Sequence, residues 1–436
     1  MQDLFRPAKA WEGFLSSPEG EFALCSLYTR DAAAQRARYL RVIKEFSERF
    51  PNMSIALVSA PGRTELSGNH TDHQRGRVLA AAVTLDIMAA VRPNENGVMR
   101  LYSEGYGEAQ ADLRDPAPRE AEKNTTAALL RGVAAGLARA GYRIGGFDAY
   151  VQSDVPQGSG LSSSAALEVL LGSIQNTLYN AGEIPALEIA KAGQFAENVY
   201  FGKPSGLMDQ SASALGGVHC IDFTDPARPV AQPVPCDFEA RGYTLYVVNA
   251  GGSHANLTPE YASIPEEMRA VAAQFRRETL NEVDEKAFRA GLPELRGRVP
   301  DRALLRALHF FEENRRVLAM ADALRKTDID CYRALMLQSG DSSMGQLQNI
   351  YPVSSEAERS VSLALALARD CLRGVGAWRV HGGGFAGTIQ ALVPHAHRKT
   401  FEGIMQTAFG KDSCFALAIR PVGGCAIGQE LGGMHV

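Results

Sequence analysis

The spacing of apolar side chains predicts alternating helices and strands in the first half of the chain. In residues 31–49 apolar side chains recur every three or four positions, the spacing of a helix with one buried face. Short apolar runs of the kind found in buried strands lie between turn sequences, and the first run stops at Pro61-Gly62. The pattern predicts helices over residues 31–49 and 124–141 and from about residue 164 to Gly182, and strands over 54–59, 78–91, 98–102 and 147–155.

A proline-rich segment separates this half from the second. Residues 225–237 contain four prolines, which exclude a helix and predict a connector or an edge strand. We therefore expect two domains, over residues 1–220 and 221–436. The second half predicts a strand at 244–249, mostly helix over 259–338, then strand (377–381), glycine turn, strand (388–393), helix (396–409) and strand (413–420). This order predicts an α+β fold with mixed sheets and helices.

Composition and charge are those of an ordinary globular protein. Of the 436 residues 45% are hydrophobic and 22% are charged, which excludes a disordered or collagen-like chain. Lys and Arg number 45 against 49 Asp and Glu, so no overall basic field favours nucleic acid. The most apolar stretch, residues 78–91, is interrupted by Thr84 and Asp86 and is shorter than the roughly 20 residues that span a membrane.

Cysteine use and the N-terminal residues predict a cytoplasmic protein. The seven cysteines are odd in number and form no CxxC, which disfavours a disulfide framework or a zinc site and favours a reducing compartment. The first residues, MQDLFRPAKAWEGF, lack the continuous apolar segment of a signal peptide. Nothing in the pattern indicates an oligomeric state.

A glycine- and serine-rich loop follows the strand predicted at 147–155. Its sequence is Pro156-Gln157-Gly158-Ser159-Gly160-Leu161-Ser162-Ser163-Ser164-Ala165-Ala166. Glycines let a ligand approach the backbone, and the unpaired N–H groups at a helix start favour an anion. The alternative is a flexible turn with a serine N-cap, but the strand before the loop and the amphipathic helix after it favour phosphate binding.

Two common nucleotide-binding motifs do not explain this loop. The chain contains no GxxxxGK[ST], so we do not expect a standard P-loop NTPase. A GxGxxG occurs at Gly382, Gly384 and Gly387, but a predicted strand follows it where the dinucleotide fingerprint needs a helix.

Two other segments concentrate polar side chains between glycines. Residues 60–73 (APGRTELSGNHTDH) form a predicted loop whose carboxylate, amide and imidazole groups suit a polyol better than a metal, the alternative being a solvated turn. Residues 201–210 (FGKPSGLMDQ) contain Asp209, which in a Gly/Pro loop is usually a cap or turn former. Asp209 gains a chemical role only if folding brings it beside the first segment.

Taken together, these segments resemble the galactokinases of the GHMP small-molecule kinase superfamily over most of the chain. Residues 60–73 resemble APGRVNxxGEHTDY, residues 156–168 resemble PxGxGLSSSAAxE, and residues 202–210 resemble GxPxGxMDQ. Residues 381–387 (HGGGFAG) resemble the late glycine motif of that family. The resemblance implies a two-domain fold with the active site in the interdomain cleft, and ATP-dependent phosphorylation of the anomeric hydroxyl of galactose.

The resemblance also implies roles for individual residues. Asp209 would be the base at the C1 hydroxyl, and Arg63 would neutralise charge between the sugar and the γ-phosphate of ATP. The sugar would be held by His70, Asp72 and the Gly206 backbone, with Tyr261 as a cap. Ser164 and Glu197 would serve Mg²⁺, and the ATP phosphates would be wrapped by Gly158, Ser159, Gly160, Leu161, Ser162, Ser163, Ser164 and Ala165. A cation beside Asp209 would keep that carboxyl ionised.

Among the departures of this chain from the family motif, which include His73 in place of a Tyr, two exchange an acid and an amide. Asn69 stands where galactokinases have a Glu that helps bind the sugar near its C6 hydroxyl, and Glu65 stands where they have an Asn. One interpretation is that Glu65 compensates and galactose remains the substrate. The other is that the site prefers a group such as the carboxylate of galacturonate, which a Glu at position 69 would repel.

A protein of a different class, a sensor that binds sugar and ATP without turnover, is also compatible with the resemblance. Such a protein should carry damage in the phosphate loop or at the base. Because GLSSSAA and Asp209 are both intact, we expect an enzyme.

Overall fold

The computed structural model describes residues 4–428 except residues 30, 157, 253–256 and 356. Gln157 of the glycine- and serine-rich loop lies outside this part. None of the described helices is both long and apolar enough to cross a membrane.

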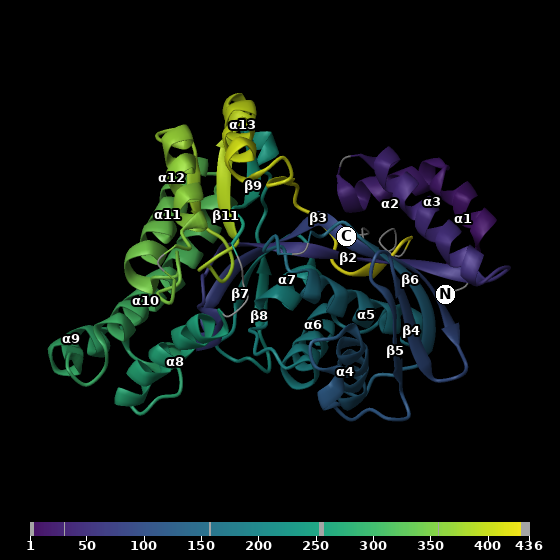
Figure 1. The fold of residues 1–436 in the computed structure, drawn as a ribbon, viewed down its shortest axis with the longest axis horizontal. Coiled ribbons are helices and arrows are strands. Elements are labelled where there is room, and N and C mark those ends of the chain that lie inside the picture. Colours follow the sequence, from purple (N-terminus) through teal and green to yellow (C-terminus); the bar gives the residue numbers. More distant parts are fainter. Residues whose placement is uncertain (1–3, 30, 157, 253–256, 356, 429–436) are drawn as a thin grey trace.

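A mixed sheet with helices on both faces forms the larger part of the fold (Figure 1). Its strands follow the order β1-β2-β3-β6-β4-β5, with β13 paired to β2 and the β7–β8 pair attached to β3. The strands are β1 (Arg6–Pro7), β2 (Ser54–Ser67), β3 (Arg77–Asn94), β4 (Val98–Ser103), β5 (Gly107–Asp112), β6 (Gly146–Ser153), β7 (Val218–Asp222), β8 (Val230–Pro233) and β13 (Cys425–Ala426).

Both faces of the central strands are buried, which explains their continuous apolar runs. Along β2, Ala56 and Val58 pack into the core formed with α4, α5 and α6, whereas Ile55 and Leu57 pack into a second core formed with α1, α2 and α3. These helices are α1 (Ala8–Leu15), α2 (Pro18–Tyr28), α3 (Ala32–Arg49), α4 (Thr126–Arg139), α5 (Ser163–Tyr179), α6 (Ala186–Phe195), followed by the π-helix η4 (Ala196–Phe201) and α7 (Met208–Leu215).

The expectation that the strand at 54–59 ends at Pro61-Gly62 is wrong, and so is the expectation of a loop over all of 60–73. β2 continues to Ser67, and its pairing with β3 shifts register between Pro61, which faces Asp86, and Arg63, which faces Ala82. A bulge accommodates a residue that has no N–H to give to the ladder, so proline does not end the strand.

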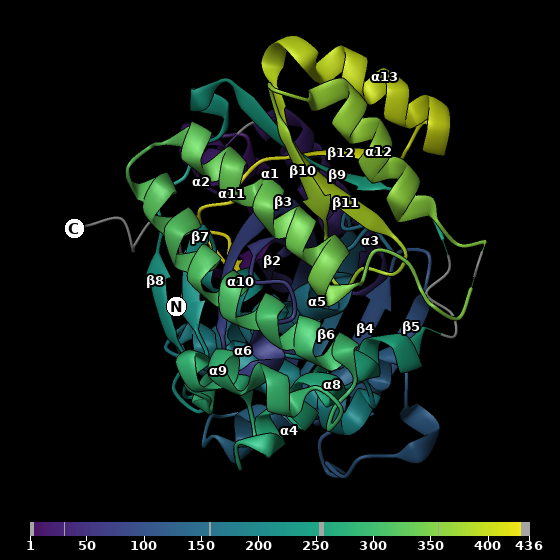
Figure 2. The same ribbon diagram turned by 90° about the vertical axis from the view of Figure 1, so that its left-hand side faces the viewer.

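The second half forms a smaller antiparallel sheet covered by helices (Figure 2). Its order is β10-β11-β9-β12, and the predicted β-turn-β-α-β order is confirmed. The remaining elements are α8 (Thr258–Gln274), α9 (Glu285–Leu295), α10 (Asp301–Arg325), α11 (Ile329–Ser342), the π-helix η7 (Ser343–Leu347), α12 (Ser360–Leu372), α13 (Arg398–Phe409), β9 (Tyr243–Asn249), β10 (Ala377–Val380), β11 (Thr388–Pro394) and β12 (Cys414–Leu417); short 3-10 helices are η2 (Asp72–Gln74), η3 (Glu120–Glu122), η5 (Glu239–Arg241), η6 (Leu280–Glu282) and η8 (His395–His397).

The proline-rich segment marks the passage between the two sheets. Within it, β8 is the edge strand predicted as one possibility, and it belongs to the first sheet; β9 begins the second. After β12 the chain returns to the first sheet, where β13 pairs with β2. The domain limits at 220 and 221 stay a prediction.

Candidate active site

Arg63 and Asp209 meet at the centre of the candidate site. Arg63 projects from β2 and Asp209 from the first turn of α7, and they form two hydrogen bonds, Nε–Oδ1 at 2.7 Å and Nη2–Oδ2 at 2.6 Å. Ser162 donates to the same Oδ2 at 2.6 Å, and Arg63 also donates to the carbonyl of Gly160. Three segments far apart in the sequence are therefore joined by one carboxylate and one guanidinium.

The charge of Asp209 follows from this contact. Burial alone would raise the pKa of Asp209, but the charge and hydrogen bonds of Arg63 outweigh burial and lower it. The expected ionised carboxylate is thus supported. The Asp209 side chain is 27% exposed against 7% for Arg63, so the carboxylate is the part of the pair that a ligand can reach.

The glycine- and serine-rich loop has the geometry of an anion site. Gly158, Gly160 and Ser162 all have positive φ, and α5 begins at Ser163. The carbonyl of Ser162 accepts from the N–H of Ala166 at 3.1 Å, so the N–H groups of residues 163–165 precede the first intrahelical bond. The rest of the predicted loop is compact, since Ser159 donates to the Pro156 carbonyl and Leu161 is buried.

A cluster of oxygen ligands lies beside the start of α5. Ser164 donates from Oγ to Glu197 Oε1 at 3.3 Å, and Gln210 donates to both Glu197 at 3.0 Å and Glu168 at 2.9 Å. Burial, followed by the charge of Glu197, raises the pKa of Glu168 well above its usual range. Lys203 donates to Glu197 Oε1 at 2.9 Å.

This donor set fits a magnesium ion that accompanies a nucleotide. Mg²⁺ takes oxygen ligands and usually combines one or two protein side chains with phosphate oxygens and water. Ser164 and Glu197 supply two oxygen atoms of that kind within hydrogen-bond distance of each other. The described residues include no group of three or more His, Cys, Asp or Glu able to hold a metal without a nucleotide.

The residues expected to hold the sugar converge on the late glycine motif and on α7. A Cβ added at Gly206 would lie 1.8 Å from Asp72 Oδ2, so only glycine lets the two segments come this close. His70 lies 3.0 Å by Nε2 from the Gly383 carbonyl, and Tyr261 donates to the Gly384 carbonyl at 3.0 Å. Burial and the nearby His73 lower the pKa of His70 to about 3. His70 is therefore neutral and donates to the carbonyl.

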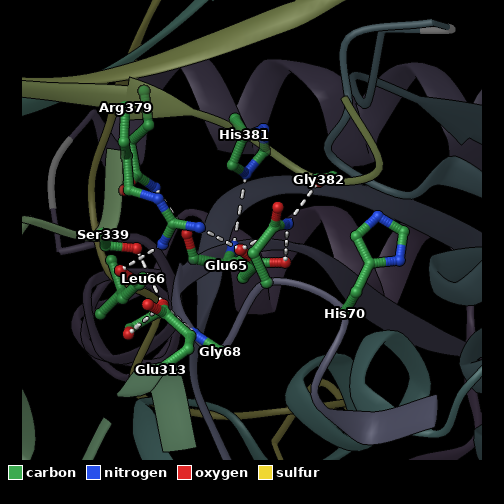
Figure 3. Close-up of polar contacts among 12 residues, drawn as sticks. Glu65, Leu66, Gly68, His70, Glu313, Ser339, Arg379, His381 and Gly382 are labelled. Carbon is green, nitrogen blue, oxygen red and sulfur yellow. Dashed lines mark hydrogen bonds and ion pairs between the residues drawn. The ribbon is translucent and has the colours of Figure 1, made fainter. Parts of the chain in front are cut away.

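Glu65, which Figure 3 shows beside Arg379, and Asn69 are both buried and hydrogen-bonded to each other. Arg379 of β10 donates to Glu65 Oε1 at 2.5 Å and to the Leu66 carbonyl at 2.7 Å. Asn69 Nδ2 donates to both oxygens of Glu65, at 3.2 and 3.3 Å, and to the Gly382 carbonyl at 2.6 Å. The carboxylate of Glu65 is thus occupied by Arg379 and Asn69.

His381 joins three of the segments singled out in the sequence. Its Nε2 accepts from the Glu65 N–H at 3.3 Å and contacts Thr64 Oγ1 at 3.0 Å. A Cβ added at Gly160 would lie 2.9 Å from its Nδ1. Burial, and then the charges of Arg63 and Arg379, lower the pKa of His381 well below its usual range. The ring is therefore neutral and fills the space between these segments.

Helix α10 contributes two residues that the sequence analysis missed. Glu313 accepts from Ser67 Oγ at 2.9 Å and from the Gly68 N–H at 3.0 Å, and His309 contacts the Asn69 carbonyl at 3.0 Å (Figure 3 shows Glu313). Burial opposes ionisation of Glu313, but Arg316 and other cations lower its pKa to about 2. A signal existed, because two ionisable residues four positions apart lie on one face of the helix.

Comparisons with known proteins identify the families and folds that this chain is similar to. A family model described as the GHMP kinases N terminal domain matches residues 128–217, and one described as the galactokinase galactose-binding signature matches residues 44–93. The crystal structure of *Lactococcus lactis* galactokinase complexed with galactose superposes with a TM-score of 0.75 at 26% identity, covering 89% of this chain and 99% of that one. A *Methanococcus jannaschii* mevalonate kinase, 16% identical with a TM-score of 0.56, shares the fold. These likenesses confirm the predicted fold class.

Curated relatives show the family. The galactokinase of *Streptomyces coelicolor* is 34% identical over 80% of this chain and 88% of its own length, and that of *Glaesserella parasuis* is 32% identical over the same shares. Because these matches extend over most of both chains and include the galactose-binding signature, this chain belongs to the galactokinase family of the GHMP kinases.

Proposed function

We propose that this protein transfers the γ-phosphoryl group of ATP to the C1 hydroxyl of galactose. The observation that carries the proposal is the Arg63–Asp209 pair, which joins β2 to α7 and contacts the glycine- and serine-rich loop. In phosphoryl transfer the protein mainly positions groups and stabilises charge. The comparisons support galactose as the acceptor, since galactokinase relatives and the galactose-binding signature match this chain.

The occupied positions on Asp209 indicate where the sugar would bind. An ionised carboxylate has about four lone-pair sites. Oδ2 accepts from Arg63 Nη2 and Ser162 Oγ, whereas among the described residues Oδ1 accepts from Arg63 Nε alone. The remaining site on Oδ1 is therefore the acceptor for the C1 hydroxyl.

The reaction then balances as a simple displacement. The C1 oxygen forms a bond to the γ-phosphorus, the bond from that phosphorus to the oxygen it shares with the β-phosphate breaks, and ADP leaves. The hydroxyl proton passes to Asp209 Oδ1 and later to solvent. Arg63 donates toward the charge that develops beside Asp209, and the N–H groups at the start of α5 bind phosphate oxygens.

Mg²⁺ would be held by Ser164 and Glu197 together with the nucleotide and would neutralise phosphate charge. We place the reaction in the cytoplasm, where ATP is available and where the seven free cysteines of this chain stay reduced.

A measurement of ADP release with galactose and MgATP tests the proposal. We expect Asp209→Asn to lower kcat by about 10²- to 10⁴-fold, the range for loss of a general base, while ATP affinity stays within a few-fold. Asp370→Asn, which changes a surface carboxylate, is the matched control and should retain full activity. Turnover near that of the parent in Asp209→Asn would refute the assignment. If the parent protein itself binds the sugar but releases no ADP, it is a sensor.

A second candidate substrate follows from positions 65 and 69. Glu65 is buried and paired with Arg379 and Asn69, and Asn69 itself is neutral. A site without an acid at position 69 tolerates a carboxylate at C6 of the sugar, as in galacturonate. The kcat/KM values for galactose and galacturonate decide between them, since a value for galactose far above that for galacturonate rejects this candidate.

A further inference from the structure

Lys203 places a second cation beside the candidate phosphate site. It follows η4 in the chain, and its own N–H donates to the Glu197 carbonyl at 3.0 Å, which fixes the base of the side chain. The ammonium lies 2.9 Å from Glu197 Oε1, the oxygen that also accepts from Ser164. The Lys203 side chain is 60% exposed whereas that of Glu197 is 3% exposed, so the ammonium stands between a buried carboxylate and solvent.

The phosphates of ATP need a cation that is not already used by the protein. The guanidinium of Arg63 is already bound to Asp209 by two hydrogen bonds and to a backbone carbonyl by a third. A triphosphate entering beside α5 would approach the carboxylates of Asp209 and Glu197, and these like charges would repel it. Lys203 interacts electrostatically with both carboxylates and has three N–H donors, of which one is bound to Glu197.

We propose that Lys203 is a phosphate-binding residue whose ammonium contacts the phosphates of ATP while it remains paired with Glu197. The inference rests on the proposed function, because it takes ATP as the nucleotide. A compact ammonium on a flexible stem suits this task, since phosphate oxygens accept from it in many directions. Lys203 and Ser164, which lies in the first turn of α5, donate to the same oxygen, Glu197 Oε1, so the ammonium lies near the start of that helix.

The simpler alternative is that Lys203 only neutralises Glu197. Both roles predict some effect of removing the charge, so a single substitution does not separate them. They differ once Glu197 is itself neutral. If Lys203 only pairs with Glu197, its removal then no longer changes ATP affinity, whereas removal of a phosphate-binding residue still lowers it.

Titration calorimetry with ATP and no sugar provides the test, both with Mg²⁺ and with EDTA. We expect Lys203→Met to weaken ATP binding by about 10- to 100-fold, the value of one charge-assisted hydrogen bond, and Lys203→Arg to restore most of the affinity. Lys191→Met is the matched control, because Lys191 pairs with Glu188 on the neighbouring helix α6 and should leave ATP binding unchanged. Galactose affinity should not change in any of these variants.

The decisive measurement repeats Lys203→Met in a Glu197→Gln background. If Glu197→Gln/Lys203→Met binds ATP more weakly than Glu197→Gln, and the difference persists in EDTA, the proposal is supported. Equal ATP affinities of these two variants overturn it. Because binding is measured without sugar, the outcome is independent of catalysis. If Lys203→Met weakens ATP binding but the parent protein phosphorylates no sugar, then the proposed function fails and the inference about Lys203 stands.

Discussion

The buried ion pair between Glu65 and Arg379 should carry much of the coupling between the tip of β2 and the smaller sheet. Both side chains are 2% exposed or less, and Arg379 Nη2 lies 2.5 Å from Glu65 Oε1. The perturbation is Arg379→Met, which keeps an unbranched side chain and removes the charge. It leaves the Glu65 carboxylate with the neutral amide of Asn69 and leaves the Leu66 carbonyl without the 2.7 Å donor.

The magnitude follows from what remains buried. Removing one member of a buried pair leaves an uncompensated charge and costs about 3–5 kcal/mol. Glu65→Gln also leaves an uncompensated charge, the buried Arg379 guanidinium, although the Gln oxygen can still accept from it. The double variant Glu65→Gln/Arg379→Met contains neither charge, and its main remaining defect is the Leu66 carbonyl, worth about 1–3 kcal/mol. The double variant should therefore be more stable than Arg379→Met alone.

Urea denaturation followed by tryptophan fluorescence measures this effect. The chain has two tryptophans, Trp11 and Trp378, so a Trp11→Phe background leaves only Trp378, the neighbour of Arg379 in β10. Transition midpoints are compared, because a chain with two sheets need not unfold in one step. Arg75→Met, which breaks a partly exposed pair with Glu282, is the control and should cost no more than about 1 kcal/mol. A double variant less stable than Arg379→Met would refute the reasoning.

Two other predictions concern acid stability and the sugar site. Burial lowers the pKa of His70 to about 3 and that of His381 well below its usual range, so below about pH 6.5 the unfolded chain binds protons that the folded chain does not, and stability falls with falling pH. The thermal unfolding midpoint should drop between pH 7 and pH 5, and less so in His381→Gln; equal drops would contradict this. Gly206→Ala places a methyl group on Asp72 and should lower kcat/KM for galactose by up to about 100-fold with ATP affinity unchanged, as steady-state kinetics and calorimetry would show.

The sequence was informative where local pattern determines structure. The helix expected at 31–49 is α3 (Ala32–Arg49), and the helical stretch at 259–338 contains α8 to α11. The condition set for Asp209, that folding bring it beside the first polar segment, is met by its contact with Arg63. Motif order and residue type were enough for this, because each glycine-bounded segment carries its chemical groups on a few consecutive residues.

Long-range pairing was not accessible in the same way. Judged from neighbouring residues alone, Pro61-Gly62 should end a strand. β2 nevertheless continues, because its pairing with β3 shifts register there and the Gly62 backbone lies against Leu161. The partner that makes the continuation favourable is more than 15 residues away in sequence. The same holds for His309 and Glu313, whose position on a buried helix face is explained only by the strand tip that they hold.

The exchange at positions 65 and 69 relocates one negative charge within the site. In this chain the acid and the amide are hydrogen-bonded to each other, with Asn69 Nδ2 donating to Glu65 Oε1 at 3.2 Å. With the acid at position 65 the charge is bound by Arg379 and enclosed by protein, and Asn69 is held by Asn349 at 2.8 Å and by Gly382. The neighbours of Asn69 already use both of its N–H donors. Asn69 therefore has no N–H left to donate to a sugar, and its expected effect on the choice of sugar comes from the missing negative charge at position 69. For the second candidate substrate, a sugar carboxylate would meet no opposing charge at position 69, so we expect galacturonate to be tolerated beside galactose, which remains the proposed substrate.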